Sequence, residues 1–237
     1  YKLRLLPSGI LYEDKICILG NGVVIEPKIF LKEVDEIKNK GIKISNLKIS
    51  NRAHIILPYH KVLDELQEED LGENKIGTTK NGIGPCYMDK AMRIGIRICD
   101  LINKELFSKK LKFNLELKNK LLKKLYNHNG FDFEEILKEY LEYGERLKPY
   151  IADTTTILNK AIKEKNNILF EGAQATMLDL EHGTYPFVTS SIPSSGGACV
   201  GSGVGPRNID NVIGVVKAYS TRVGEGPFPS ELFDEIG

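Results

Sequence analysis

A glycine-rich segment at residues 77–85, with the sequence G-T-T-K-N-G-I-G-P, has the composition of an anion-binding loop. Its glycines free the backbone, Thr78 and Thr79 add hydroxyl groups, and Pro85 suits the start of a helix. Exposed amides and hydroxyls near a helix N-terminus suit a phosphate group. A flexible surface loop accounts for the same composition equally well. The segment alone therefore leaves a phosphate site and a simple connector both open.

An arginine-bearing helix is predicted directly after Pro85. The pattern is apolar at positions 88, 92, 95, 99 and 102 and again at 91, 94, 98 and 101. The narrow polar stripe that remains consists of Lys90, Arg93, Arg97 and Asp100. Asp89 and Arg93 have the i,i+4 spacing of a helix-surface ion pair, which contributes little to stability. The alternative is that the Arg93 guanidinium offers a fork of N–H donors to a phosphate.

A third candidate segment covers residues 170–191. A short apolar strand runs into small residues and the amide Gln174, and a hydroxyl-rich turn containing Thr189 follows. An amide both donates to and accepts from a purine edge, and a threonine hydroxyl binds phosphate oxygens. His182, between Glu181 and Gly183, is interpreted as a turn or capping residue and not as a catalytic base.

Several familiar nucleotide and metal patterns are missing from the sequence. The glycine run at 196–205 does not match G-x-G-x-x-G, and G-x-x-x-x-G-K-[ST] occurs nowhere, so no nucleoside triphosphate site is complete. Four cysteines form no C-x-x-C pair and no zinc-type cluster with histidine, which favours free thiols in a reducing cytosol and predicts no metal site: Cys17, Cys86, Cys99 and Cys199.

The elements that must position these segments alternate between strand and helix. Proline at the first position and an apolar stripe predict helices from Pro27 and from Pro58, and Gly41 is placed to end the first. Buried strands are predicted at 55–57, 168–170 and 212–216, with a helical insertion at about 85–165. This pattern predicts one α/β unit over residues 1–237 with a mostly parallel sheet, where ligands bind beyond the carboxyl ends of the strands.

Composition excludes some partners. The 237 residues include 33 Lys and Arg against 32 Asp and Glu, so no overall field draws the chain to nucleic acid or an anionic membrane. The basic run at 118–124 is read as a solvated helix face. No apolar run approaches the length of a membrane span, and the start lacks the pattern of a signal peptide, so we expect a cytoplasmic protein.

The order and spacing of these segments resemble the adenylosuccinate synthetase family. The resemblance runs from Y-K-L-R-L-L-P-S-G-I at residues 1–10 through G-N-G at 20–22, the block at 77–97 and the block at 170–191 to P-F-P-S-E-L at 227–232. It covers effectively the whole chain and implies a sheet of the P-loop NTPase-like type. Two departures are visible: Lys80-Asn81 stands where Gly-Arg is common, and Ile192 replaces a usual asparagine.

The resemblance implies an IMP site and a reaction. In this family GTP phosphorylates the 6-oxygen of IMP, and the amine of aspartate then displaces that phosphate to give adenylosuccinate. It further implies that Thr79 and Thr189 bind the IMP 5'-phosphate, that Gln174 lies against the reacting edge of the base, and that Val223 lines the ribose. By the same resemblance, Arg93 is expected to reach the IMP phosphate of the other subunit in a homodimer.

The family's phosphate loop would precede Tyr1, and its guanine- and aspartate-binding segments would follow Gly237. The chain opens inside an apolar run and stops at D-E-I-G, so we expect an internal fragment whose magnesium ligands lie elsewhere and which is inactive alone. Two other readings stay open. One is a module that binds a purine nucleotide without chemistry, and the other is a helical dimerisation piece whose glycine loops are connectors.

Overall fold

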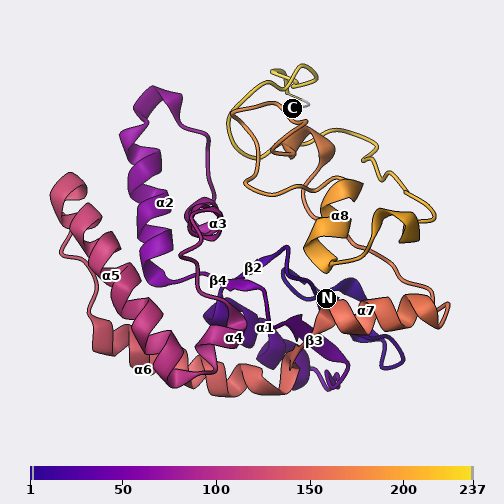
Figure 1. Cartoon of the computed structure of the whole chain (residues 1–237). Coiled ribbons are helices and arrows are strands. Elements are labelled where there is room, and N and C mark those ends of the chain that lie inside the picture. The colour runs from indigo at the N-terminus through magenta and orange to yellow at the C-terminus, as the bar shows by residue number, and fades with distance from the viewer. Residues whose placement is uncertain (2, 236–237) are drawn as a thin grey trace.

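The computed structural model describes residues 1 and 3–235 and shows a mixed α/β protein built on parallel strands (Figure 1). The first sheet has the order β1-β3-β5, and the second pairs β2 with β4. Every strand pairing within the two sheets is parallel. The strands are β1 (Cys17–Leu19), β2 (Val24–Ile25), β3 (Leu47–Ser50), β4 (His54–Ile55) and β5 (Ile151–Ala152). The predicted fold class, α/β with parallel pairing, is confirmed.

Parallel pairing requires a crossover between strands, and the helices provide it. The register places Cys17 opposite Leu47 and Ile49 opposite Ile151 in the first sheet, and Ile25 opposite Ile55 in the second. Helix α1 (Pro27–Asn39) connects β2 to β3. The longer crossover from β4 to β5 contains α2 (Pro58–Asp70) and the helices that follow it.

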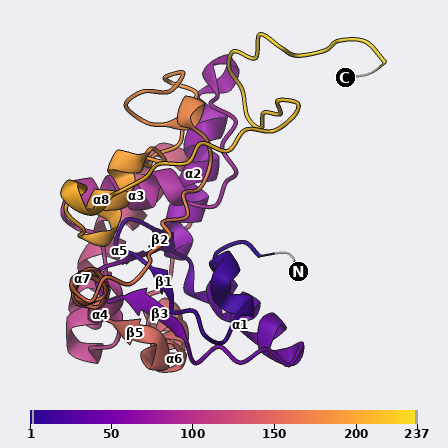
Figure 2. The same cartoon turned by 90° about the vertical axis from the view of Figure 1, so that its right-hand side faces the viewer.

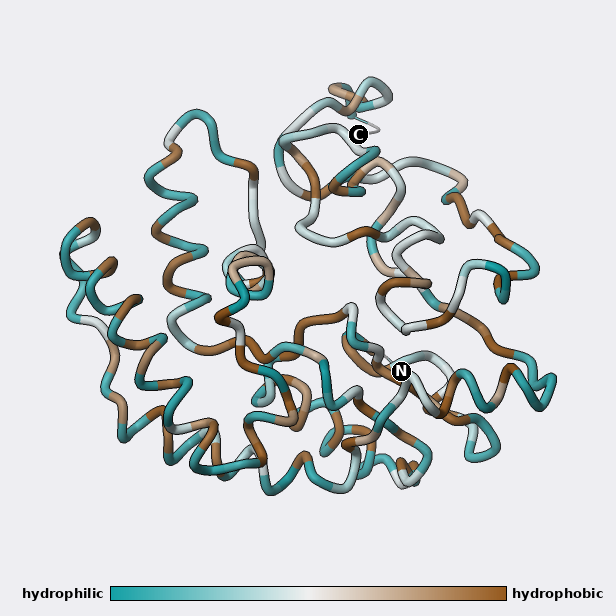
Figure 3. Tube along the Cα trace, in the orientation of Figure 1, coloured by the Kyte–Doolittle hydropathy of each residue, from teal (hydrophilic) through white to brown (hydrophobic). Residues whose placement is uncertain are grey.

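Helices α1 and α2 form where their sequences predict them. Each has proline in its first turn, where the missing N–H costs nothing. In α1 the buried apolar side chains follow one face, and Gly41 at φ +81° lies just beyond the end. Figure 3 shows the alternating apolar and polar bands that amphipathic helices produce along their turns.

The crossover after α2 is helical but interrupted. Its helices are α3 (Ile83–Ala91), α4 (Ile98–Leu101), α5 (Lys104–Tyr126) and α6 (Phe133–Leu147), and α7 (Thr154–Lys163) follows β5. Asn103, Asp132 and Asp153 cap the starts of α5, α6 and α7 by accepting backbone N–H bonds. In Figure 1, α5 and α6 lie on one flank of the sheets, while α7 and α8 (Ser195–Ser202) lie on the other. Short 3-10 turns are at Ser8–Leu11, Gly72–Asn74, Lys148–Tyr150, Thr176–Leu178 and Pro206–Asn208.

The continuous helix predicted from Pro85 to residue 102 is wrong. Helix α3 begins at Ile83 and ends at Ala91, and Arg93 has φ +65°, a left-handed conformation that no α-helix contains. Residues 94–97 then run beside β4, where the Ile55 N–H donates to the Ile96 carbonyl at 2.9 Å. Sheet-like pairing with β4 therefore outweighs the helical period that the sequence shows.

The strands predicted at 168–170 and 212–216 are also wrong. Both segments are irregular. Leu169 is 83% exposed between the partly buried Ile168 and Phe170, and in the second segment Val215 is 95% exposed. A strand needs a neighbour to take its backbone hydrogen bonds, and neither segment has a strand partner among the residues that the structure describes. Figures 1 and 2 show the C-terminal part of the chain as coil beyond the end of the sheets where the loop between α2 and α3 lies.

The glycine run at 196–205 has a packing role. The Gly22 N–H donates to the Gly201 carbonyl at 2.8 Å, and a Cβ on Gly20 would lie 2.4 Å from the same oxygen. Only glycine allows α8 to approach the 20–22 turn this closely. In the described part of the chain, no helix has the length and apolar character needed to cross a membrane.

Candidate functional site

The loop between α2 and α3 presents the hydroxyl of Thr79 at the surface. Thr79 is exposed, and its Oγ1 accepts a hydrogen bond from the Asn81 side-chain Nδ2 at 3.0 Å. A hydroxyl has one donor and two acceptor positions, so this bond leaves the O–H proton free to donate outward. The arrangement suits an anionic oxygen as the next partner.

Two carboxylates of α2 hold this loop by its backbone. Glu68 Oε1 accepts from the N–H of Gly77 at 2.5 Å and from the N–H of Thr78 at 3.2 Å. Asp64 Oδ2 accepts from the N–H of Gly82 at 2.8 Å. Both carboxylates are buried, and bonds of amides to an ionised acceptor are among the stronger hydrogen bonds in proteins. The loop is therefore fixed on both sides of Thr79.

The segment that contains Val223 lies against the same loop. The Glu225 N–H donates to the Ile76 carbonyl at 3.1 Å. A Cβ on Gly77 would lie 2.7 Å from the Glu225 nitrogen and 2.8 Å from the Gly224 Cα, so glycine is required at this contact. The side chain of Val223 itself is exposed.

The turn that carries Thr189 is organised by the buried Asp179. Asp179 Oδ1 accepts from the N–H groups of Glu181 and His182 at 2.9 and 3.2 Å, and Oδ2 accepts from the Ser194 N–H at 3.2 Å. Burial alone would raise the pKa of Asp179, but these bonds outweigh it and lower the pKa. The Thr189 N–H donates to the Leu178 carbonyl at 2.8 Å, which fixes the position of its backbone.

Arg222 joins this turn to the segment at 222–226. Its Nη2 donates to the Phe187 carbonyl at 3.0 Å and to the Glu225 carbonyl at 2.7 Å. A Cβ on Gly84, in the first turn of α3, would lie 3.3 Å from the Ser190 Oγ. Residues 76–84, 184–191 and 222–226 are thus in mutual contact, and we call them the loop cluster. The segments of Thr79, Thr189 and Val223 all belong to it.

Gln174 and Arg93 are not joined to the loop cluster by these contacts. Gln174 is exposed and has φ +58°, a strained conformation for a residue with a side chain. Its neighbour Glu171 accepts from the backbone N–H and Oγ of Ser8 at 3.3 and 2.8 Å. No hydrogen bond among the described residues links Gln174 to Thr79 or Thr189.

Arg93 lies in the turn after α3 and is exposed. Its N–H donates to the Lys90 carbonyl at 3.1 Å, and its guanidinium makes no hydrogen bond or ion pair with any residue that the structure describes. The surface pair with Asp89, one of the two readings of the sequence, is wrong. Asp89 is buried and bonded elsewhere, so the Arg93 side chain stays available for a ligand or a partner.

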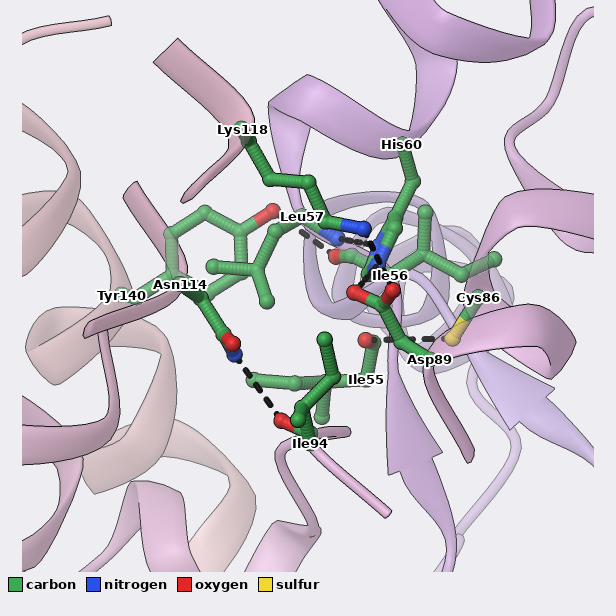
Figure 4. A network of polar contacts seen from close by, with 10 residues as sticks. All are labelled: Ile55, Ile56, Leu57, His60, Cys86, Asp89, Ile94, Asn114, Lys118 and Tyr140. Atoms are coloured by element: carbon green, nitrogen blue, oxygen red, sulfur yellow. Dashed lines mark hydrogen bonds and ion pairs between the residues drawn. The ribbon is translucent and has the colours of Figure 1, made fainter. Parts of the chain in front are cut away.

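Asp89 is the centre of a buried polar network (Figure 4). Its Oδ2 lies 3.0 Å from His60 Nε2, and its Oδ1 accepts from Lys118 Nζ at 2.5 Å. Since His60 Nδ1 accepts the Leu57 N–H at 2.9 Å, the ring proton must be on Nε2 and is donated to Asp89. Burial alone would raise the pKa of Asp89, but the bonds from His60 and Lys118 outweigh it and lower the pKa. Burial lowers the pKa of His60, so the ring is neutral.

The sequence did not single out these buried anchors. Asp64, Glu68 and Asp89 have the spacing of ordinary helix-surface charges, and the sequence shows no difference between a solvated and a buried carboxylate. The available signal was that His60, Asp64 and Glu68 recur every four residues on a helix directly before a glycine-rich loop. For Asp179, the signal was an aspartate two residues before a turn, where its side chain bonds the following amides.

Magnesium, which the family resemblance implies, does not fit the residues that the structure describes. Among the described residues, no three His, Cys, Asp or Glu side chains are grouped so that they could hold a metal ion. The buried carboxylates Asp64, Glu68 and Asp89 are already bonded to amides, a histidine or a lysine. No step of the chemistry is therefore assigned to a metal bound by these residues.

Comparison with solved structures defines the class of protein. The structure of fully ligated adenylosuccinate synthetase from Plasmodium falciparum matches with a TM-score of 0.91 and 42% sequence identity, covering 100% of this chain and 55% of that chain. The succinoaminodeoxyadenylate synthetase of cyanophage S-2L matches with a TM-score of 0.52 at 18% identity, which supports the fold alone. With the parallel strands and helical crossovers described above, these matches define a mixed α/β protein with a P-loop-like fold.

Sequence comparison then gives the family. The family model described as adenylosuccinate synthetase matches residues 1–237. The adenylosuccinate synthetases of Brachyspira hyodysenteriae and Carboxydothermus hydrogenoformans are 78% and 61% identical over 237 residues. The chain belongs to the adenylosuccinate synthetase family, whose members are ligases of purine nucleotide synthesis. It covers 56% of the length of each of these two relatives.

Proposed function

We propose that this chain forms the IMP-binding part of a GTP-dependent ligase that phosphorylates the 6-oxygen of IMP and joins aspartate to give adenylosuccinate. The observation that carries the proposal is the loop cluster, where the free donor of Thr79, the hydroxyl turn of Thr189 and the Val223 segment are held together. Family membership supports IMP, GTP and aspartate as ligands, magnesium ligands outside this chain and a cytoplasmic enzyme.

The residues have separate roles in this proposal. Thr79 and Thr189 donate their hydroxyl protons to the oxygens of the 5'-phosphate, while Val223 packs on the ribose. Gln174 contacts the base edge at the atom where phosphate and then the amine react, and it supports the chemistry without completing it. Arg93 contacts the phosphate held by the other subunit of a homodimer, which agrees with its exposed and unpaired guanidinium.

The test compares IMP with inosine, which has the same base and ribose but no phosphate. Binding is measured by calorimetry on the protein expressed from its complete reading frame. Since hydrogen bonds to a charged group contribute about 1.5–3 kcal/mol, Thr79→Ala and Thr189→Ala should each weaken IMP binding roughly 10- to 100-fold. Inosine binding should change by less than about 3-fold. If both variants weaken IMP and inosine equally, neither hydroxyl contacts the phosphate and the proposal fails.

A second measurement concerns turnover. We expect the 237-residue chain alone to form no adenylosuccinate from IMP, GTP and aspartate, because its described residues form no metal site and its sequence contains no G-x-x-x-x-G-K-[ST] loop for the triphosphate. Turnover clearly above a no-enzyme control would show that this assignment of catalytic parts is wrong.

A further inference from the structure

One face of α2 carries a buried stripe of ionisable side chains. His60, Asp64 and Glu68 follow one another at i,i+4 spacing and are 1%, 7% and 6% exposed. They hold α3 and the loop before it: His60 bonds Asp89 in α3, Asp64 bonds the Gly82 N–H, and Glu68 bonds the N–H groups of Gly77 and Thr78. We call these three residues the α2 stripe.

Burying a carboxylate is costly unless hydrogen bonds compensate for lost water. Glu68 is compensated by two backbone amides and Asp64 by one. A chain segment that only connected two helices would leave its amides to solvent, and the carboxylates would face outward. Here the two carboxylates fix the backbone conformation of one short loop, the loop that contains Thr79.

The same bonds decide which donors an anion can use. The amides of Gly77 and Thr78 are occupied by Glu68 and are not available to a phosphate. The loop therefore does not bind an anion as a phosphate loop does, through a row of free amides. It presents instead the Thr79 hydroxyl, whose direction depends on the backbone that the two carboxylates fix on either side.

Lys80, in the loop after α2, forms ion pairs with the exposed side of α2. Its Nζ lies 2.9 Å from Glu65 Oε1 and 3.8 Å from Glu69 Oε1, in partly exposed pairs. Exposed pairs of this kind contribute little. Glu69 is one residue from Glu68 and makes no bond to the loop backbone, so it is a matched control for the effect of charge on α2.

We propose that Asp64 and Glu68 are positioning residues for phosphate recognition by Thr79. This inference rests on the proposed function, in which Thr79 contacts the IMP phosphate. The bonds from Asp64 and Glu68 fix the loop backbone on both sides of Thr79 and so set the direction of its hydroxyl, on which the contact with the phosphate depends. Releasing the loop from α2 should lower affinity for the phosphate-bearing ligand and leave affinity for the nucleoside alone.

The experiment measures IMP and inosine affinity in Glu68→Ala, Glu68→Gln and Glu69→Ala proteins from the complete reading frame. We expect Glu68→Ala to weaken IMP about 10-fold and inosine by less than about 2-fold. Both loop amides bond the same oxygen, Oε1, and a glutamine side chain keeps one carbonyl oxygen, so Glu68→Gln should stay within about 3-fold of wild type. Glu69→Ala should match wild type.

Amide hydrogen exchange gives an independent readout, since Gly77 and Thr78 should lose protection in Glu68→Ala and keep most of it in Glu68→Gln. The inference is overturned if Glu68→Ala lowers thermal stability while the ratio of inosine to IMP dissociation constants stays at the wild-type value. A wild-type protein that shows no preference for IMP over inosine would instead overturn the proposed function, so the two failures are distinct.

Discussion

His60 Nε2 donates to Asp89 Oδ2 across 3.0 Å, and this bond joins the start of α2 to the last turn of α3. The opposite ring nitrogen of His60 accepts the Leu57 N–H, so the same side chain also caps α2. The backbone carbonyl of Asp89 accepts the N–H groups of Ile94 and Gly95, both at 3.0 Å. The His60–Asp89 pair thus fixes the turn that presents Arg93 as well as the helix that follows the Thr79 loop.

Removing the Asp89 carboxylate should destabilise the protein strongly. Asp89→Ala leaves the Lys118 ammonium half-buried without its partner and the His60 N–H unsatisfied, which typically costs about 3–5 kcal/mol. Urea unfolding at pH 7 measures the change. Glu145→Ala, which removes an exposed pair with Lys148, should cost less than about 0.5 kcal/mol. A loss below about 1 kcal/mol in Asp89→Ala would contradict the structural role of the network.

Stability should fall in mild acid because of His54. Burial and the nearby cations Lys90 and Arg97 lower the pKa of His54 from 6.5 to about 4, with Lys110 adding to the cations and Asp100 opposing them. The unfolded chain therefore binds more protons than the folded chain between about pH 6.5 and pH 4, and stability is lost as pH falls through this window. The lowered pKa of His60 acts in the same direction.

The size of this acid effect follows from the shift. The pKa shift of His54 corresponds to a loss of at most about 3 kcal/mol in the free energy of unfolding. Solvent screening at the partly hydrated ring reduces this loss. Denaturant midpoints at pH 7, 6 and 5 measure it. A His54→Gln variant should show a flatter pH dependence, whereas His182→Gln, at an exposed position, should retain the wild-type slope. Equal slopes in wild type and His54→Gln would refute the assignment to His54.

Replacing Gly77 should separate the Thr79 loop from the Val223 segment. Gly77→Ala places a Cβ 2.7 Å from the Glu225 nitrogen at a backbone with φ +79°. Gly72 is the matched control, since it also has positive φ, at +55°, and its Cβ would meet nothing within 4 Å. We expect Gly72→Ala to cost about 1 kcal/mol without changing IMP affinity, and Gly77→Ala to cost more and to weaken IMP several-fold.

Unfolding midpoints and calorimetric titration of both glycine variants provide this comparison. Equal effects of Gly72→Ala and Gly77→Ala would show that backbone conformation alone matters and that the contact with residues 224–225 does not contribute.

Arg93 should act in trans if the homodimer is formed as proposed. In protein expressed from the complete reading frame, Arg93→Leu and Gln174→Ala are each expected to abolish activity, because one removes a phosphate contact and the other a base contact. After subunit exchange in a 1:1 mixture, a mixed dimer contains one site with both residues intact, so roughly a quarter of wild-type activity should return. No recovery, with exchange confirmed by two differently tagged subunits, would place Arg93 in its own subunit's site or outside any site.

The sequence predicted elements whose signals are local. Proline at the first position and an apolar stripe determine α1 and α2, and both are confirmed. The helix beyond Ala91 was wrong because residues 94–97 pair with β4, a partner about 40 residues earlier in the chain that no local period reveals. The prediction of a strand at 168–170 was wrong for a related reason, because a β-strand forms only where its backbone pairs with a neighbouring strand.

The segments that form the candidate site could be predicted from the sequence, but the contacts that join these segments could not. The glycine-rich loop at 77–85 and the hydroxyl turn at 189–191 stand out in the sequence. The contacts between them depend on Arg222, whose guanidinium bonds backbone carbonyls of Phe187 and Glu225, and on the α2 carboxylates. Every residue has a backbone carbonyl, whatever its side chain. Hydrogen bonds to such carbonyls therefore cannot be predicted from the residue types in the sequence.

The exposed apolar segment at 212–216 has a consequence for handling the chain. N-V-I-G-V-V, at residues 211–216, contains no charge and no proline, and its β-branched side chains stand in solvent. Such a stretch is a template for intermolecular β-pairing, because its free backbone groups accept any extended strand. When the 237-residue chain is produced by itself, aggregation therefore competes with folding. Aggregation is intermolecular, so we expect the yield of soluble chain to fall as the concentration of newly made chain rises.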